Sequence, residues 1–346
     1  MIETVTRKIR ARSPLRLGLA GGGTDLSPYC DQFGGAVLNL TIDRYAFATI
    51  LPNPKGTIIF AADDVGIVEE FDLDSPLVSE ALTLHSAAYQ RMINDYNDGR
   101  RIPMILKTTV DAPPGSGLGS SSALVVALVE AFRMTLGAPL GPYDVAQLAF
   151  QIERIDLGLA GGRQDQYAAA FGGINFIEFL PENRVIVNPM RVSDAVKNEL
   201  ETSLVVCFSG RSRQSADIIS RQTAGLTANT DKTMVAMHQL KADALEMKGA
   251  LLGGDIEKMA EVLNRSWIAK KSTASGISTG KIDELLELAL AKGALGGKVS
   301  GAGGGGFLFF LVHPEHRYNL VMALNAAGGV ATPVKFTERG CETWQF

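Results

Sequence analysis

A loop with few side chains runs directly into an apolar segment near the middle of this 346-residue chain. The loop reads PPGSGLGSSSA at residues 113–123, where nine of eleven positions are Gly, Ser or Pro, and the apolar stretch 124–129 follows at once. Glycine lets successive backbone N–H groups point into one concavity, and a helix that begins there adds unpaired N–H groups and its positive dipole end. The pattern favours a phosphate site over a flexible linker, which would rarely run straight into a helix.

Two further glycine-rich segments adjoin strand-like sequence: LAGGGTDL at 19–26 and KVSGAGGGGFLFF at 298–310. In chain order we call 19–26, 113–123 and 298–310 the first, second and third glycine segments. Taken singly, the first or the third is as typical of a tight turn as of a ligand site. Other phosphate signatures are missing: the chain has no G-x-x-x-x-G-K-[ST] and no H-R-D or D-F-G. The second glycine segment spells GSGLGS, not G-x-G-x-x-G, and no acidic residue lies about twenty positions on at a strand end, as dinucleotide binding would require.

Composition limits the class of protein and its partners. A hydrophobic content of 46% and a charged content of 20% are typical of a globular protein. The net charge is −4 without a long basic block, which argues against a nucleic-acid surface. The three cysteines are far apart and form no CxxC pair, which favours a reducing compartment over a zinc cluster. No signal peptide or membrane span is recognisable, so we expect a cytoplasmic protein without membrane partners.

Hydrophobic periodicity predicts an α+β chain in two halves, residues 1–190 and 191–346, divided where the sequence turns polar near 180–200. The predicted strands are 5–20, 36–51, 57–60, 203–208, 307–312 and one near 332–337. The predicted helices are 79–96, 120–136, 142–157, 164–171, 216–226, 233–249, 256–269, 281–291 and a last one after 312. Helix 142–157 starts with Pro142 after a glycine, as helices often do.

Three motifs in this order resemble those of the GHMP kinases, the superfamily of galactokinase, homoserine kinase and mevalonate kinase. They are Ser13–Arg16 leading to Gly21–Asp25, then Pro114–Ala123, then Lys298–Gly306. The resemblance implies an N-terminal domain like ribosomal S5 domain 2, a ferredoxin-like C-terminal domain, and ATP and substrate in the cleft between them. It also implies Mg²⁺ as cofactor.

The first motif has Gly-Gly-Gly before Thr-Asp, where galactokinases have Gly-Glu-His. This form resembles the branch that phosphorylates the anomeric hydroxyl of sugars, which includes bacterial D-glycero-D-manno-heptose 7-phosphate kinases and fucokinases. Residues 209–219 also look like a heptose-kinase segment. We therefore expect ATP-dependent conversion of the heptose 7-phosphate to the 1,7-bisphosphate, in the synthesis of nucleotide-activated heptose for surface polysaccharide. The alternatives are an L-fucose or other neutral-sugar 1-kinase and a non-catalytic nucleotide-binding regulator.

The resemblance implies roles for four residues in phosphoryl transfer. Asp165 matches the catalytic base, Arg16 matches the cation of the first motif, and Ser121 and Glu153 match the Mg²⁺ ligands. Each residue type also has an ordinary structural role: a serine or an aspartate can cap a helix, and a glutamate or an arginine can lie on an exposed face. The ATP-binding residues that the resemblance implies are Pro114, Gly115, Ser116, Gly117, Leu118, Gly119, Ser120, Ser121 and Ser122.

A carboxylate that accepts two hydrogen bonds suits a vicinal diol, so Asp25 is expected to hold sugar hydroxyls, although a turn aspartate would look the same. The other residues assigned to the substrate are Gly22, Gly23, Thr24, Gly303, Gly304 and Arg213. Arg213 is preferred for the substrate's own phosphate, and Arg10, Arg12, Arg44, Arg211 and Lys271 are further candidates. The sequence leaves the oligomeric state open, with a homodimer as one option.

Overall fold

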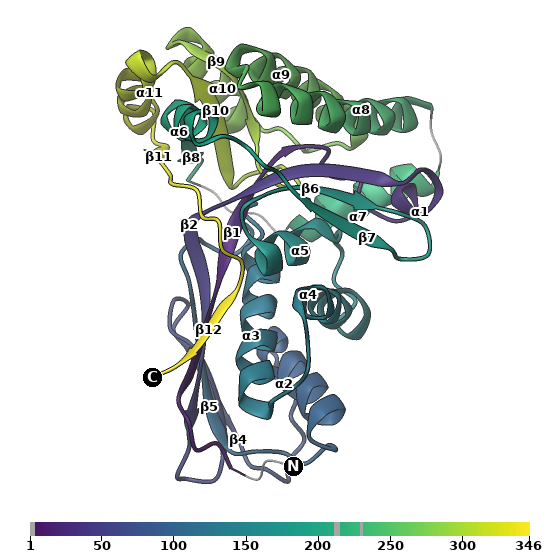
Figure 1. Cartoon of the computed structure of the whole chain (residues 1–346), viewed down its shortest axis with the longest axis vertical. Coiled ribbons are helices and arrows are strands. Elements are labelled where there is room, and N and C mark those ends of the chain that lie inside the picture. The colour runs from purple at the N-terminus through teal and green to yellow at the C-terminus, as the bar shows by residue number, and fades with distance from the viewer. Residues whose placement is uncertain (1–3, 211–214, 229–230) are drawn as a thin grey trace.

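Two β-sheets organise the chain, which the computed structural model describes at residues 4–210, 215–228 and 231–346 (Figure 1). In these residues the larger sheet has eight strands in the order β12-β1-β2-β5-β3-β4, with β6 paired to β2 and β7 to β6. The smaller sheet has the order β11-β8-β10-β9. The bounds of the strands are β1 Ile9–Ala20, β2 Gly35–Pro52, β3 Ile58–Ala62, β4 Ile67–Phe71, β5 Met104–Val110, β6 Ile174–Phe179, β7 Val185–Pro189, β8 Leu204–Phe208, β9 Ala294–Val299, β10 Phe307–Val312, β11 Val330–Thr332 and β12 Glu342–Gln345.

Helices α2 to α5 lie on one side of the larger sheet, and α8 to α11 lie around the smaller one (Figure 1). Helix α3 packs against β1 and β2 and buries most of its apolar residues, so its first turn is fixed by the main hydrophobic core. The bounds of the helices are α1 Tyr29–Phe33, α2 Thr83–Tyr96, α3 Ser120–Leu136, α4 Pro142–Gln151, the π-helix η1 Ile152–Asp156, α5 Gln164–Phe171, α6 Asp194–Ser203, α7 Ser215–Thr227, α8 Asp231–Gly253, α9 Ile256–Thr273, α10 Gly280–Ala291 and α11 Pro314–Ala326.

Strand β1 pairs antiparallel with β2, and the register shifts twice, between Pro14 and Leu15 and between Gly18 and Ala20. Such irregularities bend a strand and redirect its side chains. Arg16 lies between the two shifts, and its neighbours Leu15 and Leu17 are completely buried in the core. The strand therefore presents Arg16 on the opposite face from these leucines.

The C-terminal segment returns to the larger sheet, where β12 pairs antiparallel with β1 (yellow in Figure 1). The prediction of a strand near 332–337 was wrong: β11 ends at Thr332, and the stretch that follows has only an isolated bridge between Ile42 and Phe336. The predicted domain boundary after residue 190 lies next to the end of β7. However, β12 belongs to the C-terminal half of the chain and pairs with β1 of the N-terminal half. The main core also combines residues from both halves, such as Leu40 and Leu251.

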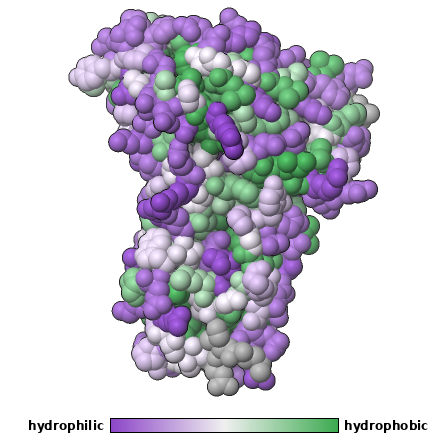
Figure 2. Space-filling view, viewed as in Figure 1, coloured by the Kyte–Doolittle hydropathy of each residue, from purple (hydrophilic) through white to green (hydrophobic). Residues whose placement is uncertain are grey.

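The surface in Figure 2 is mainly hydrophilic, with smaller groups of apolar residues interspersed. Scattered apolar residues are normal on a protein surface. None of the helices in the described ranges is long and apolar enough to cross a membrane.

Candidate active site

The second glycine segment forms an open cradle of backbone amides in front of α3. Gly115, Gly117 and Gly119 all have positive φ, at 70°, 82° and 75°, which L-residues with a side chain rarely adopt. Gly119 is the N-cap of α3, and within the described residues no side chain forms a capping hydrogen bond to this helix. The alternative role of a serine as the cap of this helix therefore does not apply, because the capping position is taken by a residue without a side chain. The first amides of α3 remain free to bind an anion.

The third glycine segment packs directly behind the cradle. Phe307 N donates to Ser116 O at 2.8 Å, and Ser300 Oγ donates to Gly117 O at 2.8 Å. A Cβ on Gly117 would lie 2.4 Å from Ser300 O, and a Cβ on Gly306 would lie 2.2 Å from Ser116 O. Both separations are below any real Cβ contact, so the glycines are needed for the two backbones to approach this closely.

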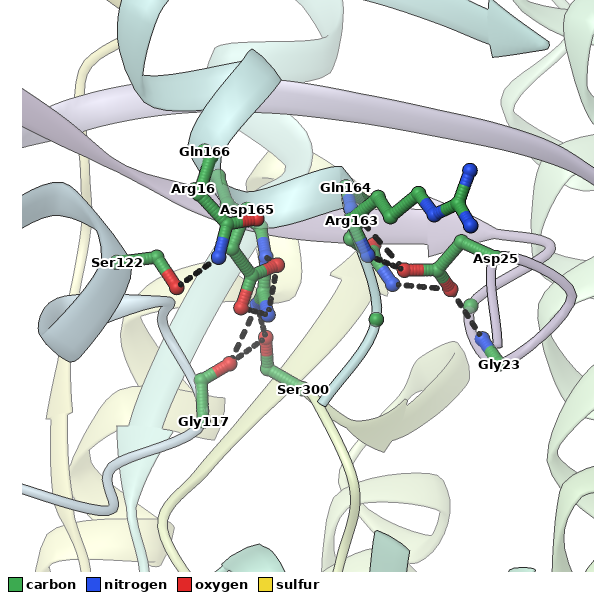
Figure 3. A network of polar contacts seen from close by, with 12 residues as sticks. Arg16, Gly23, Asp25, Gly117, Ser122, Arg163, Gln164, Asp165, Gln166 and Ser300 are labelled. Carbon is green, nitrogen blue, oxygen red and sulfur yellow. Dashed lines mark hydrogen bonds and ion pairs between the residues drawn. The ribbon is translucent and has the colours of Figure 1, made fainter. Parts of the chain in front are cut away.

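Arg16 and Asp165 form a two-pronged ion pair beside the cradle (Figure 3). Arg16 Nε donates to Asp165 Oδ1 at 2.7 Å, and its Nη2 donates to Oδ2 at 2.8 Å. Nη1 of the same guanidinium donates to Gly117 O at 2.5 Å and to Ser300 Oγ at 3.3 Å. Arg16 thus joins the second and third glycine segments to the carboxylate. Asp165 retains 21% exposure of its side chain, which leaves room for a substrate hydroxyl to approach it.

Asp25 caps the helix that carries Asp165. Its Oδ2 accepts from the backbone amides of Arg163 at 2.9 Å and Gln164 at 3.0 Å, which begin α5 (Figure 3). Its Oδ1 accepts from Gly23 N at 3.1 Å and Gln164 Nε2 at 3.0 Å. A carboxylate at this place satisfies orphan amides of the first turn and interacts favourably with the helix dipole. The first glycine segment therefore positions the base candidate, and Asp165 itself is not a cap.

Ser121 and Glu153 meet where α3 approaches η1. Ser121 Oγ donates to Glu153 Oε1 at 2.8 Å, and Gln166 Nε2 donates to Glu153 Oε2 at 2.5 Å. Glu153 is completely buried, so the alternative structural role on an exposed helix face does not apply to it. Two oxygens bound to one Mg²⁺ in adjacent octahedral positions lie about 2.9 Å apart, given Mg–O distances of about 2.0–2.1 Å. This hydroxyl and carboxylate therefore fit the ligand set that Mg²⁺ prefers.

Comparison with known proteins identifies the family of this arrangement. Residues 83–173 match the family profile "GHMP kinases N terminal domain", and residues 247–330 match "GHMP kinases C terminal". The D-glycero-alpha-D-manno-heptose 7-phosphate kinase of Campylobacter jejuni is 42% identical over 340 residues, which cover 98% of this chain and 99% of that protein. The chain belongs to the GHMP kinase family. The predicted α+β GHMP kinase fold is thereby confirmed.

Solved structures and more distant relatives of this GHMP kinase agree with that assignment. A D-glycero-D-manno-heptose 1-phosphate kinase from Bacteriodes thetaiotaomicron superposes with a TM-score of 0.82 and 40% identity, covering 98% of this chain and 99% of its own. The bifunctional fucokinase/GDP-fucose pyrophosphorylase of Arabidopsis thaliana is 26% identical over 88% of this chain, which spans 30% of that longer protein. The heptose-phosphate kinases are thus far more similar to this chain than this fucokinase is.

The candidate active site of this GHMP kinase contains two lysines that were not assigned to the substrate from the sequence. Lys270 on α9 and Lys298 on β9 line the same cavity of about 420 Å³ as Arg16, Asp25 and Asp165. Burial lowers the pKa of Lys270 to about 8 and that of Lys298 to about 7. Lys298 belongs to the third motif, which could have identified it as a site residue from the sequence. The sequence does not distinguish Lys270 as a site residue, because its neighbour Lys271 is also a lysine.

Several residues assigned to the substrate lie elsewhere. Thr24 is buried and donates to Gly21 O at 2.8 Å, so it holds the turn of the first glycine segment. Gly304 N donates to Ile277 O at 2.7 Å, and a Cβ on Gly303 would lie 2.7 Å from the same oxygen. Gly303 and Gly304 therefore pack against a loop behind the cavity and do not line it, whereas Gly22 and Gly23 do.

The four described cations that were considered for the substrate's phosphate do not line the cavity. Arg12 pairs with Glu342 of β12, Arg10 lies over the ring of Phe346, and Arg44 donates to Thr332. Lys271 is exposed, with its ammonium over the ring of Trp267. Arg211 and the preferred Arg213 lie outside the described residues.

Proposed function

We propose that this GHMP kinase transfers the γ-phosphoryl group of ATP to the anomeric hydroxyl of D-glycero-D-manno-heptose 7-phosphate, giving the 1,7-bisphosphate. The observation that carries the proposal is the Arg16–Asp165 pair, which stands beside the amide cradle and is joined to it through Gly117. The 42% identity to a heptose 7-phosphate kinase over nearly the whole chain supports the choice of acceptor.

In this proposal the amides of the second glycine segment hold the phosphates of ATP, since unpaired N–H groups and the dipole of α3 both favour anions. Asp165 accepts the proton of the anomeric hydroxyl, whose oxygen forms a new bond to the γ-phosphorus while the bond from γ-phosphorus to the bridging oxygen breaks and ADP leaves. Arg16 stabilises the charge on the moving phosphoryl group and holds Asp165 in place through two parallel hydrogen bonds.

Ser121 and Glu153 would hold Mg²⁺ through their oxygen atoms. When bound, Mg²⁺ would neutralise negative charge on the nucleotide phosphates. Gln166 positions Glu153 by donating to its second oxygen, and Gln166 also donates to Ser122 Oγ at 3.1 Å (Figure 3). The carboxylate is thereby fixed from α5, the same helix that carries Asp165.

The proposed product is a sugar phosphate activated at its anomeric carbon, as a later nucleotide transfer requires. We therefore also propose a place in the synthesis of nucleotide-activated heptose for surface polysaccharide, in the cytoplasm.

A panel of acceptors tests the proposed function. The heptose 7-phosphate, the heptose 1-phosphate, the free heptose, L-fucose and mevalonate are each offered with ATP and Mg²⁺, and ADP release is followed. We expect the heptose 7-phosphate to give the highest kcat/KM, and phosphorus NMR to place the new phosphate on C1. Turnover of L-fucose without turnover of the heptose phosphate would reject the proposal in favour of a neutral-sugar 1-kinase. A new phosphate on any carbon other than C1 would reject the assigned regiochemistry.

A further inference from the structure

Two ammonium groups from different elements point into the cavity beside the first glycine segment. Lys270 Nζ, on α9, donates to Gly22 O at 3.0 Å. Lys298 Nζ, on β9, donates to Leu19 O at 3.2 Å. Each ammonium has three N–H donors, and each makes this one hydrogen bond among the contacts of the described residues. The cavity thus contains donors that its own walls do not satisfy.

Neither lysine forms an ion pair with a carboxylate in the described part of the chain. The nearby carboxylates already serve other groups: Asp25 accepts four hydrogen bonds, and Asp165 is occupied by Arg16. Asp243, another charged neighbour of Lys298, is buried and accepts from the side chains of Arg265 and Ser266. Partly buried cations without a counter-ion are unfavourable unless a ligand supplies the negative charge.

We propose that Lys270 and Lys298 form a subsite for the phosphate that the sugar substrate already carries. This inference rests on the proposed function, because it requires a phosphorylated acceptor. The nucleotide phosphates have their own donors in the cradle amides and Arg16, next to α3. Lys270 instead lies at the first glycine segment, where a Cβ on Gly23 would be 3.4 Å from its Nζ.

Helix α7 forms part of the cavity wall near the first glycine segment. Helix α7 contributes Ala216, Ile219 and Gln222 to the cavity wall, and Gln222 lies so near Gly23 that a Cβ there would be 2.7 Å from its Nε2. The two lysines, this wall and Asp165 thus all line one continuous cavity. A sugar whose anomeric oxygen meets Asp165 would therefore occupy the cavity that the two lysines line.

The charge state of the lysines gives the subsite a pH dependence. Burial is the largest cause of both lowered pKa values. The positive charge of Arg16 also lowers the pKa of both lysines, and Lys270 further lowers the pKa of Lys298. Both ammonium groups therefore lose protons in the free enzyme as the pH rises through about 7 to 8, and a phosphate dianion would favour the protonated forms. We expect kcat/KM for the sugar phosphate to fall in this range. The other charged groups that face these lysines are Asp25, Arg16, Asp165 and Asp243.

The variants Lys270→Met and Lys298→Met test the subsite, with Lys271→Met as the matched control on the same helix. Methionine keeps most of the length of the unbranched side chain and removes the charge, and a far-UV spectrum with a nucleotide titration checks that each variant folds. We expect each cleft variant to raise the KM for the heptose 7-phosphate about tenfold or more, with the KM for ATP changed less than about twofold. Lys270→Arg, which keeps the charge, should retain more affinity than Lys270→Met.

The outcomes separate this proposal from the proposed function. No turnover of the heptose 7-phosphate by the unaltered enzyme would remove the proposed function, and the subsite with it. Normal turnover by the unaltered enzyme, with an unchanged KM for the sugar phosphate in both cleft variants, would overturn the subsite alone. A rise in the KM for ATP in place of that for the sugar phosphate would assign the lysines to the γ-phosphate and also overturn it. If the two cleft variants reduced the turnover of the free heptose as much as that of the heptose 7-phosphate, this would also contradict the subsite.

Discussion

Replacing Asp25 by Asn is expected to destabilise the fold and to slow catalysis, because Asp25 holds the beginning of the helix that carries Asp165. The two carboxylate oxygens accept four hydrogen bonds of 2.9–3.1 Å, three of them from backbone amides. The side-chain amide of asparagine has one oxygen, which can still accept two hydrogen bonds. Its NH₂ group would face the other two donors and cannot accept hydrogen bonds from them. Loss of two charge-assisted hydrogen bonds costs about 1.5–3 kcal/mol each, so the free energy of unfolding should fall by about 3–6 kcal/mol.

Thermal unfolding and steady-state kinetics measure the two consequences. A loss of this size should lower the unfolding midpoint by about 6–12 °C, taking about 2 °C per kcal/mol for a chain of this size. A displacement of Asp165 by about 1 Å should reduce kcat about 100-fold. Asp194→Asn is the control, since Asp194 is 95% exposed and its variant should change stability by less than about 0.5 kcal/mol. If Asp25→Asn kept its midpoint and kcat and raised only the KM for the sugar, Asp25 would serve the substrate and the capping argument would be refuted.

Three further substitutions test other parts of the site. Asp165→Asn removes the proton acceptor and should reduce kcat about 100-fold or more while the affinity for ATP is kept, as a nucleotide titration would show; unchanged turnover would remove the assignment. Ser121→Ala should raise the Mg²⁺ concentration needed for half-maximal activity, and an unaltered Mg²⁺ titration would exclude this hydroxyl as a ligand. Gly117→Ala places a Cβ 2.4 Å from Ser300 O at a φ of 82°, so the KM for ATP should rise about tenfold or more; an unaltered KM would show that the cradle does not need this backbone.

The regular elements with strong periodicity were predictable. Helices α3 and α5 and strand β10 have the predicted bounds, because glycine or proline marks their ends and their apolar residues recur at the right spacing. The sequence did not reveal that the predicted helix 142–157 changes after Gln151 into a π-helix. It also did not reveal β12, whose four residues become a strand only because the edge of β1 is free to pair.

Within the site, residues in motifs were easier to find than residues brought there by tertiary packing. Arg16, Asp165, Ser121 and Glu153 were named from the sequence, and the structure brings them to one cavity. Lys270 was missed because helical periodicity does not distinguish it from Lys271; the packing of α9 against β1 and β9 decides which of them faces the cleft.

The capping of α5 by Asp25 could not be read from the sequence either. The carboxylate and the amides of Arg163 and Gln164 are separated by 138 and 139 positions in the chain. Local capping patterns connect residues within a few positions, so no such pattern applies here.

A crystal structure with a non-hydrolysable ATP analogue, Mg²⁺ and the heptose 7-phosphate is the most direct test of the proposed transfer. We predict the nucleotide phosphates on the amides of the second glycine segment, with the anomeric oxygen of the sugar about 2.6–3.2 Å from a carboxylate oxygen of Asp165 and facing the γ-phosphorus. A γ-phosphate remote from Asp165, or a sugar bound with another hydroxyl at that carboxylate, would contradict the account.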